Sequence, residues 1–319
     1  MLKKFLAAAV WISLSATTSA FAETFVLDLT HPIPTFKPME GDPMKPDTNQ
    51  PWGDSVPIPS FAGQAILSFS DFPTNQGKFE VGRLILGEHH GTHLDSPAHY
   101  ANNDASMEPG GTPPKDRKRT HQLDANDLTG PVVLIDISGR VETELAKNGG
   151  KPSPDKGVTD FSESSPNVVT ADDIGAVADQ LDDGVWLVLN TAWSKFFFQG
   201  ADFAKDPYIN GWNHPGISHG AVDKLIELMD KKNIKVSGIV ADNIGVDSGE
   251  SARGEDDKWT NSWYAHVRLL QRGVKLVENA ANLGQLAMAK PGSCTLVVGA
   301  PKHVRGAGGP SRVIAMCEK

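Results

Sequence analysis

Three short apolar runs, separated from one another by amphipathic segments, constrain the fold of this chain more than any other feature. They occupy residues 132–137, 185–189 and 236–240. The first is typical of a strand that is buried on both faces, the second is predicted to be a buried strand, and the third is predicted to be another strand. Between them, Thr170 and Ser218 each predict the start of a helix with one apolar face. The alternation of helix and strand predicts an α/β fold, with a mixed central sheet or a barrel-like β core that is flanked by helices.

A second feature is the segment EHHGTHLDSPAH at residues 88–99, which holds four of the ten histidines. A glycine and a proline inside the segment disfavour a helix, so an extended conformation is expected. Side chains alternate between the two faces of an extended strand, which predicts that His89, His93 and Asp95 project in the same direction, with His99 just beyond the proline.

Two imidazoles and a carboxylate form half of a metal site. They suit zinc or another divalent first-row cation, and three protein ligands leave coordination positions open, as in a catalytic site. Opportunistic metal binding by clustered surface histidines is the alternative. The spacing and the added carboxylate favour the dedicated site.

The segment resembles the H-x-G-T-H-x-D-x-P-x-H signature of the metal-dependent cyclase superfamily, which includes bacterial kynurenine formamidases (arylformamidases) and isatin hydrolases. Every fixed position is filled, by His89, Gly91, Thr92, His93, Asp95, Pro97 and His99. The resemblance implies that His89, His93 and Asp95 bind metal, and that His99 is the general acid and base. It also implies a fold of the swivelling β/β/α type.

A later pair of residues extends the resemblance, because His266 is followed by Glu278 in a V-E-N context. We expect His266 to begin a short helix that Gly273 ends, and a strand from Val274 to carry Glu278. In the family, such a pair forms the second half of the metal site. The resemblance therefore implies that Asp95, in the first motif, bridges two metal ions. It also implies that His266 and Glu278 complete the ligands of the second ion. A buried ion pair is the alternative for Glu278, since unpaired buried carboxylates are costly.

Two further segments match the family, DLTHPI at residues 28–33 and DNIGVD at residues 242–247. The second commonly has a serine where this chain has Gly245, so no role of that hydroxyl is carried over. Asp242 and Asp247 are candidates for orienting the imidazoles of metal ligands. Carboxylates of a turn at a strand end are the equally favoured alternative.

The first 22 residues have the pattern of a cleaved secretory signal. Two lysines precede an apolar run at residues 5–16, and the small-x-small sequence AFA follows at residues 20–22. The run is shorter than the roughly 20 residues that span a bilayer, which disfavours a membrane anchor. We therefore expect an exported protein, periplasmic or secreted, whose residues 23–319 form one cyclase-like hydrolase domain without a membrane span.

The charge balance is acidic. The chain has 30 lysines and arginines and 39 aspartates and glutamates, a net charge of −9, which becomes −11 when the two lysines of residues 1–22 are removed. Binding of nucleic acid or of an anionic membrane is not predicted. We expect a small-molecule substrate and a homo-oligomer.

Cys294 and Cys317 are the only cysteines. Each lies beside a strand-like run, and antiparallel pairing of the two runs would bring the cysteines together. An oxidising compartment permits a disulfide between them. Two independent thiols are the alternative.

Two segments are predicted to lack regular structure. Residues 34–75 are rich in proline and polar residues, which indicates a loop or lid near the site. Within this segment, Trp52 and Phe61 are expected to pack rather than to contact substrate. Residues 139–166, rich in glycine, serine and charge, are expected to be a surface insertion without a chemical role.

The predicted site favours hydrolysis of an amide, N-formyl or lactam bond. One or two divalent ions, zinc first and manganese second, would activate a water and polarise the carbonyl, and His99 would carry the proton to the departing nitrogen. Trp193 and Phe196 follow a strand end and are candidate contacts for an aryl group. The family's aryl substrates favour an aromatic amide.

A rival hypothesis is an exported metal-binding or ligand-binding protein with the same fold and no turnover. The presence of His99 favours the enzyme, because a binding protein has no need of a proton carrier. A serine hydrolase is the weaker rival, because the chain's one G-x-S-x-G match, GISHG at residues 216–220, holds Ser218, which is already predicted to begin a helix.

Overall fold

The computed structural model describes residues 23–70, 79, 81–100, 117–200, 205–253 and 263–319. The predicted signal at residues 1–22 lies outside the described residues and stays a prediction. Of the helices in the described part of the chain, none combines the length and the apolar character needed to cross a bilayer.

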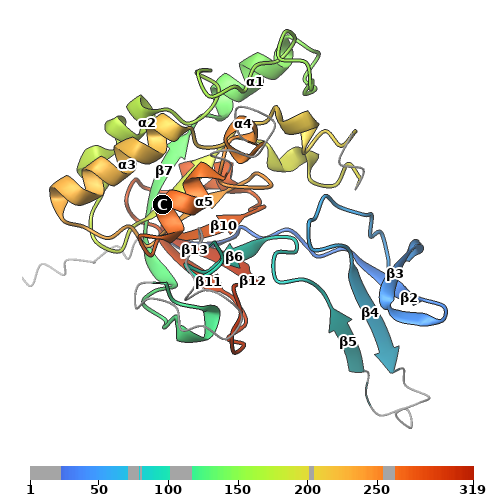
Figure 1. The fold of residues 1–319 in the computed structure, drawn as a ribbon. Helices are drawn as coiled ribbons and strands as arrows, with labels where there is room; N and C mark the ends of the chain where they lie inside the picture. Colours follow the sequence, from blue (N-terminus) through green and yellow to red (C-terminus); the bar gives the residue numbers. More distant parts are fainter. Residues whose placement is uncertain (1–22, 71–78, 80, 101–116, 201–204, 254–262) are drawn as a thin grey trace, which may run out of the picture.

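A nine-stranded mixed sheet forms the body of the molecule and curls into a half-barrel (Figure 1). Its strand order is β1-β13-β11-β7-β8-β9-β10-β6-β12. The strands are β1 (Thr24–Asp28), β6 (His93–Asp95), β7 (Thr129–Asp136), β8 (Trp186–Asn190), β9 (Gly238–Ala241), β10 (Lys275–Glu278), β11 (Thr295–Gly299), β12 (Gly308–Pro310) and β13 (Arg312–Glu318). β7 to β10 are parallel, and the outer strands are antiparallel. The predicted mixed sheet flanked by helices is confirmed.

The middle residues of the central strands are apolar because both faces of these strands are covered. Leu187 and Leu189 of β8 belong to a core that the helices cover, whereas Trp186 and Val188 pack in a second core with residues of β1, β11 and β13. Gly238, in the neighbouring strand, is needed beside the indole of Trp186, since a Cβ there would lie 2.3 Å from that ring. Two hydrophobic cores therefore hold the sheet from its two sides.

Helices α2 (Ala171–Ala176) and α3 (His219–Lys232) lie together over one face of the sheet (Figure 1). Thr170 and Ser218 cap them as predicted, each accepting a hydrogen bond from the backbone N–H three residues further on. The other helical elements are α1 (Ser138–Ala146), α4 (Gly249–Arg253) and α5 (Tyr264–Leu270), with 3-10 turns η2 (Thr120–Gln122), η3 (Ala178–Gln180), η4 (Ser194–Phe196), η5 (Asn210–Trp212) and η6 (Leu283–Met288).

A second sheet of four strands projects from the body (Figure 1). Its order is β3-β2-β4-β5, and the strands are β2 (Thr35–Met39), β3 (Asp42–Pro51), β4 (Ala65–Ser70) and β5 (Val81–Ile85). The loop predicted for residues 34–75 is therefore wrong at residues 35–39, 42–51 and 65–70, and residues 71–75 lie outside the described residues. β3 holds three prolines, but it is an edge strand, where a missing N–H is tolerated.

Residues 139–166 are not a surface insertion either. They include most of α1, whose Val141 and Leu145 are fully buried. Phe161 is also fully buried and packs edge-on against Trp193, with 5.2 Å between ring centroids. Val141, Leu145 and Phe161 attach this otherwise polar segment to the core.

The C-terminal strands confirm the predicted cysteine pairing. β11 and β13 are antiparallel, with Thr295 opposite Met316, so the residues just outside this pair face each other. Cys294 and Cys317 form a disulfide there, and both cysteines are buried.

Candidate metal centre

The histidine-rich segment enters the centre of the molecule through a turn and a very short strand. β5 ends at Ile85 in the projecting sheet, Gly91 adopts a φ of 63° in the turn, and β6 begins only at His93. The single extended strand predicted from His89 to Asp95 is therefore wrong. The turn nevertheless returns His89 to the cluster, with its ring centroid 5.2 Å from that of His93.

The register of β6 explains how the two motifs meet. β6 lies between β10 and β12 and is antiparallel to both. Glu278 of β10 is the direct cross-strand partner of His93, and Leu276 is that of Asp95. Side chains of directly opposed residues lie on the same face of a sheet. A glutamate distant in sequence thus becomes the neighbour of the first motif, and α5, just before β10, presents His266 beside it.

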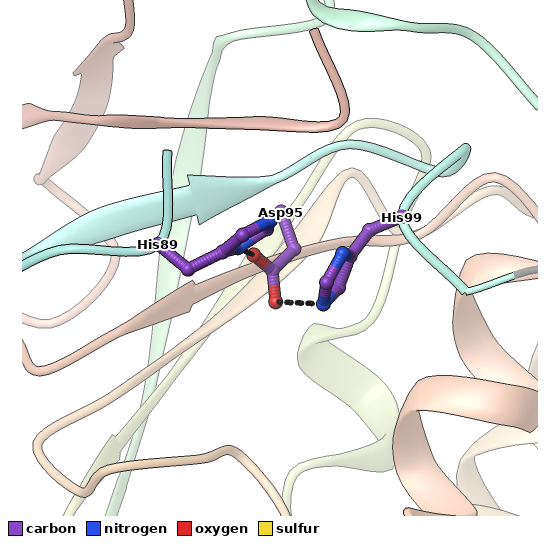
Figure 2. Close-up of side chains that lie close together, drawn as sticks. All are labelled: His89, Asp95 and His99. Atoms are coloured by element: carbon purple, nitrogen blue, oxygen red, sulfur yellow. Dashed lines mark hydrogen bonds and ion pairs between the residues drawn. The ribbon is translucent and has the colours of Figure 1, made fainter. Parts of the chain in front are cut away.

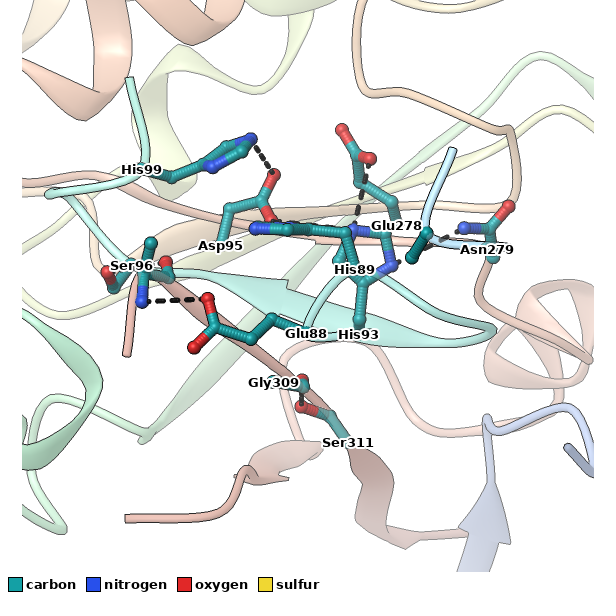
Figure 3. Close-up of polar contacts among 12 residues, drawn as sticks. Glu88, His89, His93, Asp95, Ser96, His99, Glu278, Asn279, Gly309 and Ser311 are labelled. Carbon is teal, nitrogen blue, oxygen red and sulfur yellow. Dashed lines mark hydrogen bonds and ion pairs between the residues drawn. The ribbon is translucent and has the colours of Figure 1, made fainter. Parts of the chain in front are cut away.

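Asp95 is fully buried at the middle of the cluster (Figure 3). Its Oδ1 lies 2.5 Å from His89 Nδ1 and 3.4 Å from His93 Nε2. Its Oδ2 lies 3.4 Å from His266 Nε2 and 4.0 Å from His99 Nε2. Figure 2 shows the rings of His89 and His99 beside this carboxylate. The two oxygens of Asp95 therefore face different pairs of imidazoles.

Glu278 also joins two imidazoles. Its Oε2 lies 3.4 Å from His93 Nε2, and its Oε1 lies 3.1 Å from His266 Nε2. All three side chains are buried. Each carboxylate of the cluster thus spans two histidines.

The structure brings together all six residues that the sequence singled out for metal binding and proton transfer. Within the described part of the chain, two groups of donor atoms are close enough to hold an ion, one from His89, Asp95 and His99 and the other from His93, Asp95 and Glu278. Asp95 belongs to both. The first group includes His99, to which the sequence hypothesis gives only a role in proton transfer.

Contacts behind the imidazoles turn them toward the cluster. His93 Nδ1 lies 2.9 Å from the carbonyl oxygen of Gly91, and His266 Nδ1 lies 2.6 Å from Asp247 Oδ2, so that each Nε2 faces the carboxylates. Asp247 thus has the orienting position that we considered for it. Asp242 does not, because its carboxylate accepts hydrogen bonds from the loop that follows β8.

Sequence reasoning missed Asn279, which directly follows Glu278. Its Nδ2 donates to the carbonyl oxygen of Gly91 at 3.0 Å, and the hydroxyl of Tyr208 donates to its Oδ1 at 3.0 Å. Asn279, directly after β10, therefore holds in place the Gly91 carbonyl that orients His93. Asn279 has a φ of 54°, a left-handed conformation that asparagine tolerates better than most residues. An asparagine directly after a predicted strand is therefore the sequence signal that could have identified it.

Charge is strongly coupled within the cluster. Burial disfavours protonation of His93, but Asp95 and Glu278 outweigh it and raise the pKa of His93 to about 9. Burial also opposes charge on His266, and Glu278 leads the interactions that hold its pKa well above the ordinary value. Burial would raise the pKa of Asp95, yet the surrounding imidazoles, His99 first, hold it well below its usual range. The imidazoles around Asp95 therefore favour the ionised form of this buried carboxylate.

These residues fit a divalent metal ion. Imidazole nitrogens and carboxylate oxygens are ligands that zinc and manganese both accept. Asp95 Oδ2 is buried and has no hydrogen-bond donor among the described residues, as expected of an oxygen that a cation completes.

A cavity of about 290 Å³ adjoins the cluster, and the histidines line part of it. Its other lining residues are largely apolar and include Phe61, Tyr100, Ile244 and Trp263. Phe61 is 62% exposed, and its ring lies edge-on to Trp263 at 6.1 Å. A Cβ at Gly245 would lie 3.2 Å from the Trp263 ring, so this glycine leaves room for the indole. The cavity combines metal donors with an aromatic wall.

Trp193 and Phe196, the predicted aryl contacts, have a different place. Trp193 is fully buried in the core, where its Nε1 donates to the carbonyl oxygen of Tyr208 at 2.8 Å. Phe196 packs against it, with 5.0 Å between ring centroids. Neither is among the described residues that line the cavity. Their aromatic character serves the core, and Phe61, which we expected only to pack, lines the cavity instead.

Comparison with known families agrees with this geometry. The family model described as "Putative cyclase" matches residues 27–248, more than half of the chain. The chain belongs to the cyclase family. The matched range includes residues 89–99 and Asp247, and it ends before His266 and Glu278.

This cyclase-family protein is similar to isatin hydrolases. It is 27% identical over 281 residues to isatin hydrolase from Roseibium aggregatum, with 84% of this chain and 89% of the relative covered. A solved isatin hydrolase bound to the product analogue thioisatinate aligns with a TM-score of 0.62 at 24% identity, over 93% of this chain and 94% of that one. Isatin hydrolase A from Ralstonia solanacearum aligns with a TM-score of 0.61 at 22% identity, over 92% of each chain. The structural likeness supports the fold.

Proposed function

We propose that this cyclase-family protein is a metal-dependent amidohydrolase that opens a lactam, or cleaves an amide or N-formyl bond, in an aromatic substrate. One observation carries the proposal, namely that two carboxylates and four imidazoles converge beside an aromatic-walled cavity. The similarity to isatin hydrolase supports a lactam as the first choice of substrate, because isatin is an aromatic lactam. Export is part of the proposal, and the disulfide supports an oxidising compartment.

The metal would be held by His89, His93, Asp95, His266 and Glu278. When bound, a divalent cation polarises a carbonyl and lowers the pKa of water toward neutrality. Asp95 is suited to serve two ions, because its two oxygens face different histidines. We propose zinc or manganese, as one or two ions.

His99 is assigned the transfer of the proton. It is partly exposed and lines the cavity, and its Nε2 lies 4.0 Å from Asp95 Oδ2, so the carboxylate stabilises the imidazole while it carries the proton. From this position His99 takes a proton from the attacking water and delivers it to the departing nitrogen. Its other neighbour, His89, lies within 3.9 Å between ring centroids and keeps the ring in place.

The aromatic wall is assigned the selection of substrate. Phe61 and Trp263 present ring surface to the cavity, and aromatic rings pair favourably with a planar aryl group. A volume of about 290 Å³ is at the small end of ligand pockets, which favours a single small ring system.

Turnover of a substrate panel tests the proposal. The purified protein is assayed with isatin, an aryl formamide and a non-aromatic lactam, before and after chelation and after readdition of zinc or manganese. We expect hydrolysis of an aromatic substrate that chelation abolishes and one of the metals restores. Stoichiometric metal without turnover of any of the three would favour a binding protein instead.

A further inference from the structure

A second cavity lies at the opposite end of the parallel strands from the metal cluster. Its volume is about 1100 Å³, and its walls come from the starts of β9 and β10, the end of α3 and the turn after α5. Lys275, the first residue of β10, lies in its wall, and Glu278 is the last residue of the same strand. Pro97 of the histidine-rich segment also lies in its wall, but this cavity shares no lining residue with the cavity beside the metal cluster.

Lys275 is unusual because its charged side chain is buried. The residue is only 4% exposed, and its Nζ lies 5.6 Å from the centroid of the Trp186 ring. Burial lowers the pKa of Lys275 to about 8, so the amine is still mainly protonated at neutral pH. A buried ammonium group is costly unless an anion or several hydrogen-bond acceptors compensate it.

The four aspartates of the cavity wall already have other partners. Two of them are bonded to side chains: Asp127 accepts from Lys118 Nζ at 2.6 Å, and Asp230 accepts from Arg272 Nη2 at 3.1 Å. The other two accept from backbone N–H groups, Asp124 from those of Asn126 and Asp127 and Asp183 from that of Lys235. Asp127 and Asp124 favour the charged form of Lys275 through space. No hydrogen bond or ion pair to Lys275 Nζ is found within the described part of the chain, so this cation lacks a bonded counter-ion.

The rest of the wall decides what kind of anion would fit. Apolar side chains, among them Leu123, Met229 and Ile234, border the cavity together with the polar groups. Most of the other lining residues are polar or charged. One buried positive charge matches one negative charge, and the apolar side chains among the lining residues favour a ligand with a hydrocarbon part. We propose that this cavity binds a small organic monocarboxylate, with the carboxylate on Lys275 Nζ and the hydrocarbon part against Leu123, Met229 and Ile234.

The test uses the metal-loaded, full-length protein and para-bromobenzoate as the probe. Calorimetric titration is carried out on wild type, on Lys275→Met and on Lys235→Met, a matched control at an exposed lysine of the same wall. We expect Lys275→Met to weaken binding by about 10- to 100-fold, as for loss of a charge-assisted hydrogen bond. Lys235→Met should bind as wild type does. Lys275→Gln is a second neutral variant, and thermal melting confirms that each variant is folded.

Crystals soaked with the probe distinguish this cavity from the metal centre, which also attracts carboxylates. The anomalous signal of bromine should lie in the cavity beside Lys275 in wild type and in Lys235→Met, and it should be absent from Lys275→Met. Bromine at the metal centre alone, or equal affinity in wild type and both Lys275 variants, would overturn the proposal. Displacement of the probe by inorganic phosphate more readily than by benzoate would overturn the assignment to an organic carboxylate.

Discussion

Asp95 is the residue on which the whole centre depends, because its two oxygens contact two separate pairs of imidazoles. We predict that Asp95→Ala or His93→Ala loses bound metal and activity together, since each removes a donor that faces the cluster. Elemental analysis of the purified variants checks this result. His121→Ala, a histidine outside the cluster, is the control and should retain metal. Wild-type metal content in either cluster variant would contradict the assignment.

His99 gives a second prediction at this scale, because proton transfer and metal binding are separable. We expect His99→Ala to keep its metal and to lose roughly 10²- to 10⁴-fold in kcat, the contribution typical of a positioned acid or base. His99 also lies within reach of the donor group of His89 and Asp95. Metal content measured beside kcat decides between the two roles, and loss of metal from the variant would make His99 a ligand.

Glu278 tests the number of ions. Glu278→Gln keeps the size of the side chain but replaces a charged oxygen donor by a weaker neutral amide. We predict two ions in wild type and a fall toward one in the variant, with reduced activity, because the oxygens of Glu278 contact His93 and His266. Titration with zinc and with manganese gives the stoichiometry. If wild type binds only one ion per chain when zinc or manganese is in excess, the dinuclear assignment is wrong and the protein is a mononuclear hydrolase.

At the scale of elements, the pairing of strands does more for the site than any single turn. β6 is only three residues long, yet β10 on one side and β12 on the other fix its register. That register places His93 opposite Glu278. A shift of one residue would move these side chains to opposite faces of the sheet.

The disulfide that joins β13 to the residue just before β11 leads to a prediction about stability. Cys294 and Cys317 are 23 residues apart, and closing a loop of this length should contribute about 3 kcal/mol to the free energy of unfolding. We predict that the double variant Cys294→Ala/Cys317→Ala loses about this much stability in denaturant unfolding and keeps its metal content and kcat. Thiol titration of unfolded, unreduced wild type should find no free thiol. Altered metal content in the double variant would show that the disulfide also supports the site.

For the whole molecule, buried histidines predict a loss of stability on acidification. His214 is fully buried, and burial lowers its pKa from 6.5 to about 4. Between these two values the unfolded chain binds a proton that the folded chain does not, so the free energy of unfolding falls as the pH falls from 6.5 to 4. For this one group the loss is up to roughly 3 kcal/mol.

Chemical denaturation at pH 7 and at pH 4.5, in chelator to remove the linkage to metal, measures the effect. We expect His214→Gln to lose part of the difference in stability between the two pH values, because glutamine does not titrate. His121→Gln, at a less buried position, serves as the control and should keep the wild-type difference. Equal pH dependence in wild type and His214→Gln would contradict the prediction.

The whole molecule also shows which parts of the site can be anticipated from local pattern. The metal donors can be anticipated, because His89, His93, Asp95 and His99 are close together in the sequence. Imidazole and carboxylate groups also restrict the chemistry to a few possibilities. The substrate wall cannot. Trp193 is an aromatic residue after a strand end, as a contact residue would be, but packing places it in the core. Phe61 comes from a segment that composition alone describes as irregular.

The sequence by itself determined the alternation of buried strands and capped helices, the compatibility of the two cysteines with a disulfide and the residue types available to bind metal. Each of these depends on periodicity or on chemistry that is present within a short window of the chain. Only the tertiary structure decided that β10 lies in register with β6, that β2, β3 and β4 join β5 in a second sheet, and that Phe61 and Trp263 share one wall. These features depend on contacts between segments far apart in the chain, for which no local period exists.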